Sequence, residues 1–275
     1  MIRPGLVLLA GQCFGPTTDK HLEVSAVAEM IHVATLLHDD VMDEGQMRRG
    51  VPTVNRMWGN ESAVLLGDFV LSQVFRMVAD LDPGVARIIG NTAVCVCEGE
   101  LRQVAQKQNW QLTEAAYLSI ITAKSAAFFS GCCRLGALLS GADEPQIEAM
   151  ARYGLNAGIA FQIADDLMDV VGDEDRTGKT VQSDLSKSKL TLAMIHLVDA
   201  VGVSGKEAVY TLLDSSVQSR NELRKMLVRH GSLQYAHRRA LDYVRKATEA
   251  LDTTPPGEAK DALLETARFV ADRTA

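Results

Sequence analysis

Two copies of one acidic motif, Asp-Asp-x-x-Asp, lie far apart in this sequence. On a helix, the first and last aspartates of such a motif lie one above the other on the same face. Like charges at that spacing repel, and the negative end of a helix disfavours carboxylates, so each effect costs about a few tenths of a kcal/mol. We therefore expect a compensating cation. The aspartates are Asp39, Asp40, Asp43, Asp165, Asp166 and Asp169.

The chemistry of these clusters points to magnesium. Hard divalent cations prefer oxygen ligands, and Mg²⁺ typically takes a few carboxylates and completes its shell with water and substrate phosphates. One such motif alone is as easily a solvated acidic helix end. Two identical motifs, each at the end of an apolar, buried type of helix, favour a metal site.

Polar side chains upstream of each cluster continue the same helix face. His32 and Thr35 are in line with Asp39, and Gln162 is in line with Asp165. A lone His or Gln on an apolar helix is usually a core residue with satisfied hydrogen bonds. Aligned with the carboxylates, these residues indicate the wall of a cavity.

Basic residues accompany both clusters. Arg48 and Arg49 follow the first cluster, Lys124 interrupts an apolar segment, and Lys179 follows the second cluster. Arginine binds phosphate through paired hydrogen bonds, and lysine binds it as a point charge. Singly, each except Lys124 is more typical of a solvated surface. Beside a metal site, they indicate a site that stabilises a departing diphosphate.

Helical periodicity recurs along the chain, and no segment shows the sustained two-residue alternation of a strand. Breaks coincide with stretches rich in Gly and Pro, and no linker or repeat divides the sequence. We expect an all-α fold with a single domain over residues 1–275. The predicted helices span residues 3–14, 20–43, 61–81, 84–108, 113–140, 145–171, 189–200, 205–213, 216–229, 232–251 and 257–272.

Composition excludes several classes of protein. The formal net charge of −7 disfavours a nucleic-acid partner, which requires a basic face. The apolar run at residues 6–10 is short for a secretion signal, and no stretch is predicted to span a membrane. The five cysteines lack the spacing of a zinc site and are expected to be reduced and mostly buried, which favours a cytoplasmic location.

The segments around both clusters resemble those of trans-isoprenyl (polyprenyl) diphosphate synthases, particularly long-chain members. They are HDDVMDEGQMRRGVPTVNRMWGNESAVLLGDFVLSQVF and GIAFQIADDLMDVVGDEDRTGKTVQSDLSKSKLTL. The segments IRPGLVLLAGQCFG, ITAKSA and LLETARFVADR also fit, so the resemblance covers nearly the whole chain. It implies a large orthogonal helical bundle of the isoprenoid synthase type with a central hydrophobic cavity, usually in a homodimer.

The resemblance also implies a Mg²⁺-dependent prenyltransferase that joins an allylic diphosphate to isopentenyl diphosphate. Ionisation gives an allylic cation, the double bond of isopentenyl diphosphate attacks it, and a proton is lost. By this analogy the six aspartates hold Mg²⁺. The allylic diphosphate is bound by Arg48, Lys124 and Lys179, and the allylic substrate is positioned by Gln162. Isopentenyl diphosphate is bound by Arg3, His32 and Arg49.

Two residues one turn before Asp39, Ala34 and Thr35, bear on product length. In the family, the growing chain runs down this helix away from the first cluster, so bulky residues here stop elongation early. Neither residue is aromatic, which predicts a product longer than geranylgeranyl diphosphate. Phe69 is a candidate for the floor of the cavity, although core packing is the favoured interpretation of this residue.

Departures from the family pattern leave alternatives open. The family's GGKxxRP segment is matched here only from Met1 onward, without its lysine and the helix that precedes it. In a later family motif, Ser188 and Ala193 replace a Gly and a Pro. One alternative is a non-catalytic or regulatory subunit of a heteromeric synthase. Another is a class I terpene cyclase, which is disfavoured because such cyclases usually carry one DDxxD motif.

Overall fold

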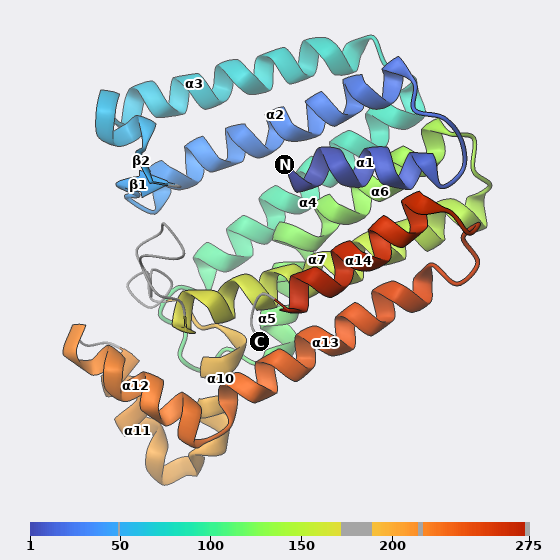
Figure 1. Ribbon diagram of the computed structural model, residues 1–275. Helices are drawn as coiled ribbons and strands as arrows, with labels where there is room; N and C mark the ends of the chain where they lie inside the picture. Colours follow the sequence, from blue (N-terminus) through green and yellow to red (C-terminus); the bar gives the residue numbers. More distant parts are fainter. Residues whose placement is uncertain (49, 172–188, 214–216, 273–275) are drawn as a thin grey trace.

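The computed structural model describes residues 1–48, 50–171, 189–213 and 217–272, and it confirms the all-helical prediction (Figure 1). In Figure 1, α2 and α3 lie side by side along one edge, α6 and α7 pass through the middle, and α13 and α14 cover the opposite side. The helices are α1 (Ile2–Gln12), α2 (Asp19–Met42), α3 (Val54–Ala79), α4 (Pro83–Ala105), α5 (Glu114–Ile121), η1 (Thr122–Ala126), α6 (Ala127–Leu139), α7 (Glu144–Val171), α10 (Leu192–Ala200), α11 (Gly202–Leu213), α12 (Val217–Arg229), α13 (Ser232–Ala250) and α14 (Glu258–Asp272).

Two predicted helices differ from the observed ones by more than a few residues at an end. Helix α3 begins at Val54 rather than at residue 61 and is kinked at Gly59, which has a φ of 85°. The single helix expected over 113–140 is interrupted by η1, a five-residue π-helix, between α5 and α6. No Gly or Pro marks this interruption in the sequence. π-Helical turns are rare and occur frequently at functional sites.

The start of α2 is fixed by a buried histidine. The backbone N–H of Thr18 donates to Nδ1 of His21, so the other ring nitrogen carries the proton and faces the hydroxyl of Ser140 at 3.0 Å. His21 is fully buried. Its imidazole thereby joins the N-terminus of α2 to the end of α6, and this anchors the helix that carries the first aspartate cluster.

The end of α2 is followed by a small antiparallel hairpin, β1 (Met47–Arg48) and β2 (Val51–Pro52), in a stretch expected to be a loop. The chain leaves α2 through Glu44, whose φ is 51°, and the N–H of Gly45 donates to the carbonyl of Asp40 at 2.8 Å. This turn directs Arg48 back toward the helix that precedes it.

The apolar core has two parts that meet along α7. One lies among α1, α2, α6, α7, α13 and α14, and the other lies among α5, α7 and α10 to α13. The side chain of Tyr243 packs against both. Helix α7 therefore runs through the interior, and the second aspartate cluster lies at its carboxyl end.

One helical run is more apolar than the sequence pattern indicated. The run Glu114–Leu139 is long and apolar enough to cross a membrane by length and composition. It is interrupted by η1, and half of its most apolar window is buried by packing within the bundle. We interpret it as a core segment of the helical fold.

The contact between α1 and α6 generates a prediction about stability. A Cβ atom at Gly136 of α6 would collide with the carbonyl oxygen of Val7, whereas one at Gly5 of α1 would meet no atom within 4 Å. Gly136→Ala is expected to lower the free energy of unfolding by about 1–3 kcal/mol, because the two helix backbones must separate. Gly5→Ala is expected to raise it by about 0.5–1 kcal/mol. Urea unfolding measures both, and equal stability of the two variants would contradict this packing.

Candidate active site

A pocket of about 690 Å³ opens between α2, α4, η1 and α7, with the start of α1 at its edge. Asp39 of α2 and Asp165 of α7 both line it, so one member of each aspartate cluster faces the same space. Most of the predicted binding residues line it as well. These are Arg3, His32, Thr35, Arg48, Lys124 and Gln162.

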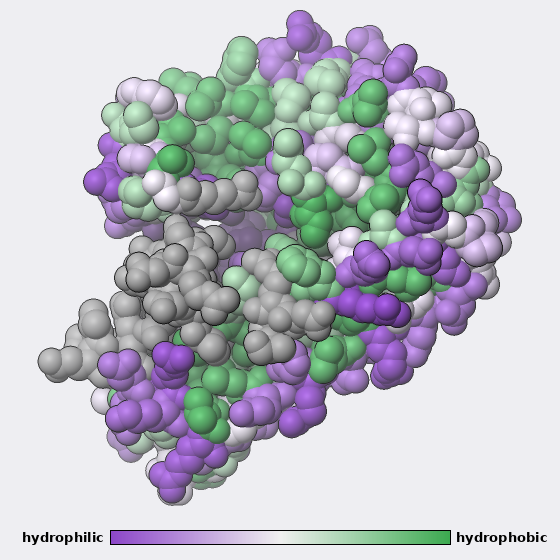
Figure 2. Space-filling model, in the orientation of Figure 1, coloured by the Kyte–Doolittle hydropathy of each residue, from purple (hydrophilic) through white to green (hydrophobic). Residues whose placement is uncertain are grey.

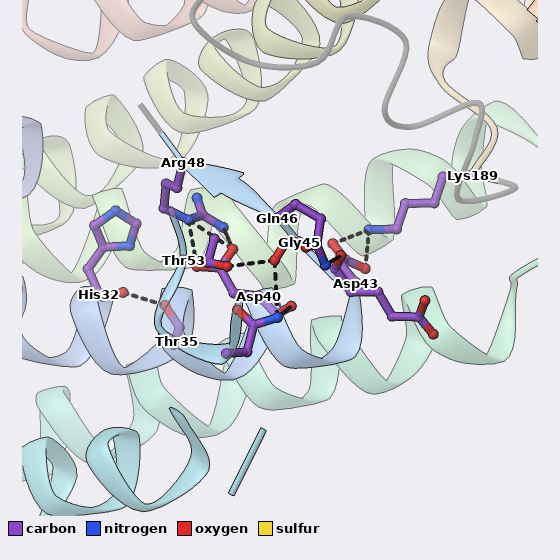
Figure 3. Close-up of polar contacts among 11 residues, drawn as sticks. His32, Thr35, Asp40, Asp43, Gly45, Gln46, Arg48, Thr53 and Lys189 are labelled. Atoms are coloured by element: carbon purple, nitrogen blue, oxygen red, sulfur yellow. Dashed lines mark hydrogen bonds and ion pairs between the residues drawn. The ribbon is translucent and has the colours of Figure 1, made fainter. Parts of the chain in front are cut away.

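Asp40 is held by the hairpin that follows it (Figure 3). The Nε of Arg48 donates to both carboxylate oxygens at 3.0 and 3.1 Å, and one terminal nitrogen donates to Oδ1 at 2.7 Å. Asp40 is only 7% exposed. Its carboxylate therefore orients Arg48 at the edge of the pocket, and this pairing was not foreseen from the sequence.

Asp43 pairs with a lysine that the sequence analysis did not single out. The Nζ of Lys189 lies 3.4 Å from Asp43 Oδ2, as Figure 3 shows, and both side chains are largely buried. Lys189 lies within the segment SKSKLTL, whose resemblance to the family does not indicate this contact. The ion pair joins the first cluster to the chain that enters α10.

Lys124 is the cation on the wall of the pocket that η1 forms. It lies on η1, donates to Oε1 of Gln103 at 2.7 Å and forms an ion pair with Glu100, and neither partner was predicted. Burial alone would lower the pKa of Lys124, but the carboxylates of Asp39 and Glu100 raise it above its usual value. The side chain therefore stays charged. Glycine is required at position 99 because a Cβ there would collide with the backbone of Lys124.

For Asp39, burial and the neighbouring charges together disfavour the charged form of the side chain. Burial raises the pKa of its carboxyl, Lys124 lowers it, and Glu100 and Asp43 raise it, so that the pKa lies above its usual value. The carboxylate is thus the costly form of this side chain in the protein alone. A cation bound at Asp39 would remove that cost.

The other predicted residues are placed as follows. Asp166 lies beside Asp165 but accepts hydrogen bonds from Gln162 and Tyr117, and Asp169 is half-buried one turn farther along α7. Ala34 is fully buried on α2. Core packing was the favoured interpretation of Phe69, and this is wrong, because its side chain is 59% exposed on α3. Arg49 and Lys179 lie outside the described residues.

The donor chemistry suits a hard divalent cation. Within the described part of the chain, no three His, Cys, Asp or Glu side chains already converge on one point. The carboxylates instead stand on two walls of one pocket, with Asp39 on one and Asp165 on the other. Such walls fit Mg²⁺ whose shell is completed by the phosphate oxygens of a ligand between them.

A narrow apolar seam adjoins the pocket. Val96 and Phe128 line both spaces. The seam runs along α2 past Ile31, Ala28 and Val24, and α4 and α6 form its other sides. Polar groups for an anion and apolar groups for a hydrocarbon chain are therefore continuous in this structure.

Comparisons with known proteins identify relatives of similar sequence and similar fold. The polyprenyl synthetase family profile matches residues 1–229. The chain is 34% identical over 278 residues to a short chain isoprenyl diphosphate synthase from Methanothermobacter thermautotrophicus, covering 99% of this chain and 86% of that protein. It is 32% identical over 276 residues to the octaprenyl diphosphate synthase of Escherichia coli, covering 99% and 85%. The crystal structure of a polyprenyl synthase from Caulobacter crescentus, complexed with calcium and isoprenyl diphosphate, has a TM-score of 0.94 at 32% identity and covers 100% of this chain and 85% of that one.

The raised pKa of Asp39 generates a prediction about stability. A carboxyl whose pKa is higher in the folded than in the unfolded protein weakens the fold as the pH rises through that raised value. Asp39→Asn is therefore expected to raise the unfolding temperature at pH 7 in the absence of divalent metal. This gain should shrink as the pH falls toward the usual aspartate value of 3.8.

Asp252→Asn provides the control for that experiment, because Asp252 is exposed and distant in sequence from both clusters. Differential scanning calorimetry of both variants between pH 4 and pH 7, in roughly one-unit steps across the carboxyl range, makes the comparison. An Asp39→Asn protein that is less stable than the wild type at pH 7 would contradict the proposed cost of the buried carboxylate.

Proposed function

The chain belongs to the polyprenyl synthetase family, and on that premise we propose that it condenses an allylic diphosphate with isopentenyl diphosphate in a Mg²⁺-dependent reaction. The observation that supports this most directly is the shared pocket. Asp39 and Asp165 line it together with Lys124, and the apolar seam adjoins it. Carboxylates for metal, cations for diphosphate and an apolar continuation for the prenyl chain are the parts that this reaction requires.

Mg²⁺ bound in the pocket would neutralise the charge that develops on the departing diphosphate. Asp39 and Asp165 are the proposed principal ligands because they line the pocket. Asp43 and Asp169, one turn farther along their helices, are the proposed additional ligands. Asp40 and Asp166 complete the two clusters, and their contacts with Arg48, Gln162 and Tyr117 support a role in orientation.

Different residues of the chain bind the two substrates. Lys124 and Arg48 bind the allylic diphosphate, together with Lys179. Gln162 helps to position the allylic substrate, while Arg3, His32 and Arg49 bind isopentenyl diphosphate. The guanidinium of Arg3 lies 4.9 Å from the ring centroid of Phe128, which keeps this cation at the pocket wall.

In the reaction, the allylic carbon–oxygen bond breaks and its electron pair stays with the diphosphate. The double bond of isopentenyl diphosphate attacks the resulting allylic cation, a new carbon–carbon bond forms, and a proton leaves to the released diphosphate. Phe128 and Phe161 line the pocket, and aromatic faces stabilise a nearby cation. The apolar side chains of Val96 and Phe128, which line both the pocket and the seam, would shield that cation from water.

We propose that the product is longer than geranylgeranyl diphosphate. Thr35 lines the pocket and Ala34 is buried beside it, so neither presents a bulky side chain to a growing chain. Short-chain and octaprenyl synthases are similar to this chain at nearly the same sequence identity, so identity does not indicate the length of its product. The proposed length is therefore supported by Ala34 and Thr35.

Product analysis tests both the activity and its length. The purified chain alone, incubated with an allylic primer, excess isopentenyl diphosphate and Mg²⁺, is expected to give products longer than geranylgeranyl diphosphate. Thr35→Phe is expected to shorten the main product, and Val33→Phe, on the exposed side of α2, is expected to leave it unchanged. A wild-type enzyme that stops at farnesyl diphosphate would refute the length argument, and an inactive one would favour the regulatory-subunit alternative.

We further propose that the chain acts as a homodimer. Figure 2 shows apolar side chains gathered on the surface over α3. Leu65, Phe69 and Phe75 of α3 are 68%, 59% and 71% exposed, and Leu101 of α4 is 70% exposed. Apolar surface of this extent is typical of a protein interface. We propose a second copy of the chain as the partner at this surface. Each copy is proposed to act as a single domain in the cytoplasm.

Light scattering after gel filtration tests the dimer. The wild type is expected to elute at twice the mass of one chain, and Phe69→Lys is expected to shift it toward the monomer, because a charge would be buried between the copies. Phe269→Lys is the matched control, since Phe269 is 66% exposed on α14. Dissociation by both variants alike, or by neither, would contradict the assignment of this surface.

A further inference from the structure

Tyr117 of α5 contacts the second aspartate cluster from outside the pocket. Its hydroxyl donates to Oδ2 of Asp166 at 2.6 Å, and its side chain is 4% exposed. The other carboxylate oxygen of Asp166 accepts from Nε2 of Gln162 at 2.8 Å. Both oxygens of this carboxylate thus have a fixed donor, which restrains the torsion angles of the side chain.

The hydrogen-bond chain continues to the opposite wall of the pocket. Gln162 accepts at Oε1 from the hydroxyl of Ser125 at 2.6 Å, and Ser125 follows Lys124 on η1. Ser125, Gln162, Asp166 and Tyr117 therefore form one continuous series. It links the wall that carries Lys124 to the helix that carries Asp165, and both of those side chains line the pocket.

Helix α5 is also anchored through its first turn. Glu114 accepts from Arg239 Nε at 2.8 Å and from the hydroxyl of Tyr235 at 2.5 Å, both on α13. Tyr117, one turn farther along, ties α5 to α7, and α5 leads directly into η1. A shift of α5 would move Lys124 relative to Asp165.

We infer that Tyr117 is a positioning residue that holds the second aspartate cluster and the π-helical turn in register. This inference rests on the proposed function. Through Asp166, the phenol fixes the end of α7 against the segment that carries Lys124, so that metal and diphosphate meet ligands already in place. Groups that orient metal ligands typically contribute about 10–100-fold to metal affinity or activity.

The test uses Tyr117→Phe, which keeps the ring and removes the hydroxyl. We expect kcat to fall about 10-fold or more, half-saturating Mg²⁺ to rise by a similar factor, and KM for isopentenyl diphosphate to stay within about twofold. The increase in unfolding temperature caused by Mg²⁺ with inorganic diphosphate should also shrink. This second readout needs no turnover.

Tyr153→Phe is the matched control. Tyr153 lies on α7, the helix that carries Asp166, and is fully buried. It donates an equally short hydrogen bond of 2.6 Å, but to the carbonyl of Leu263, away from the aspartates. It is expected to lose stability without any change in Mg²⁺ dependence. If Tyr153→Phe raised the Mg²⁺ requirement as much as Tyr117→Phe, the effect would be structural and the inference would be wrong.

A second pair of variants separates the pathway through Asp166 from a general effect on folding. In an Asp166→Asn background, Tyr117→Phe is expected to cause no further loss, because the interaction that it removes is already altered. Full additivity of the two losses would overturn the inference, as would a Tyr117→Phe protein with wild-type kcat and Mg²⁺ dependence. An inactive wild type would instead overturn the proposed function.

Discussion

Negative charge gathered on two walls of one pocket is the constraint on which this structure depends. Asp39 reaches the pocket from α2 and Asp165 reaches it from α7, with Glu100 nearby. Lys124 offsets part of this charge, yet burial still keeps the pKa of Asp39 above its usual value. The protein alone therefore holds the carboxylate of Asp39 at a cost in stability, as is common where function rather than stability selects the residues.

The surrounding helices keep these groups in place. His21 anchors the start of α2, and the Arg48–Asp40 ion pair closes its end against the hairpin. On the opposite wall, the absence of a side chain at Gly99 lets α4 approach η1 closely enough to bring Glu100 to Lys124. The site is thus built from rigid elements, so the geometry of its ligands is set before substrate arrives.

Much of this arrangement was predictable because helical spacing is local. The first aspartate of each motif, Asp39 and Asp165, the line of His32 and Thr35, and Lys124 in an apolar segment were all predictable, and these residues do line one pocket. The features that could not be predicted from the sequence depend on tertiary contacts. The pairing of Asp40 with Arg48 requires the hairpin, and Tyr117 reaches Asp166 across 49 positions of sequence. No residue preference marks the π-helical turn, and the exposure of Phe69 reflects a helix face that the chain does not cover by itself.

Binding of Mn²⁺, followed by electron paramagnetic resonance with and without an unreactive allylic thiolodiphosphate, tests the central claim most directly. The account predicts weak uptake by the protein alone, tight uptake once the diphosphate analogue is present, and loss of that enhancement in Asp165→Asn. Equally tight binding without the analogue, or an enhancement that survives Asp165→Asn, would show that the two clusters do not share a metal and diphosphate between them.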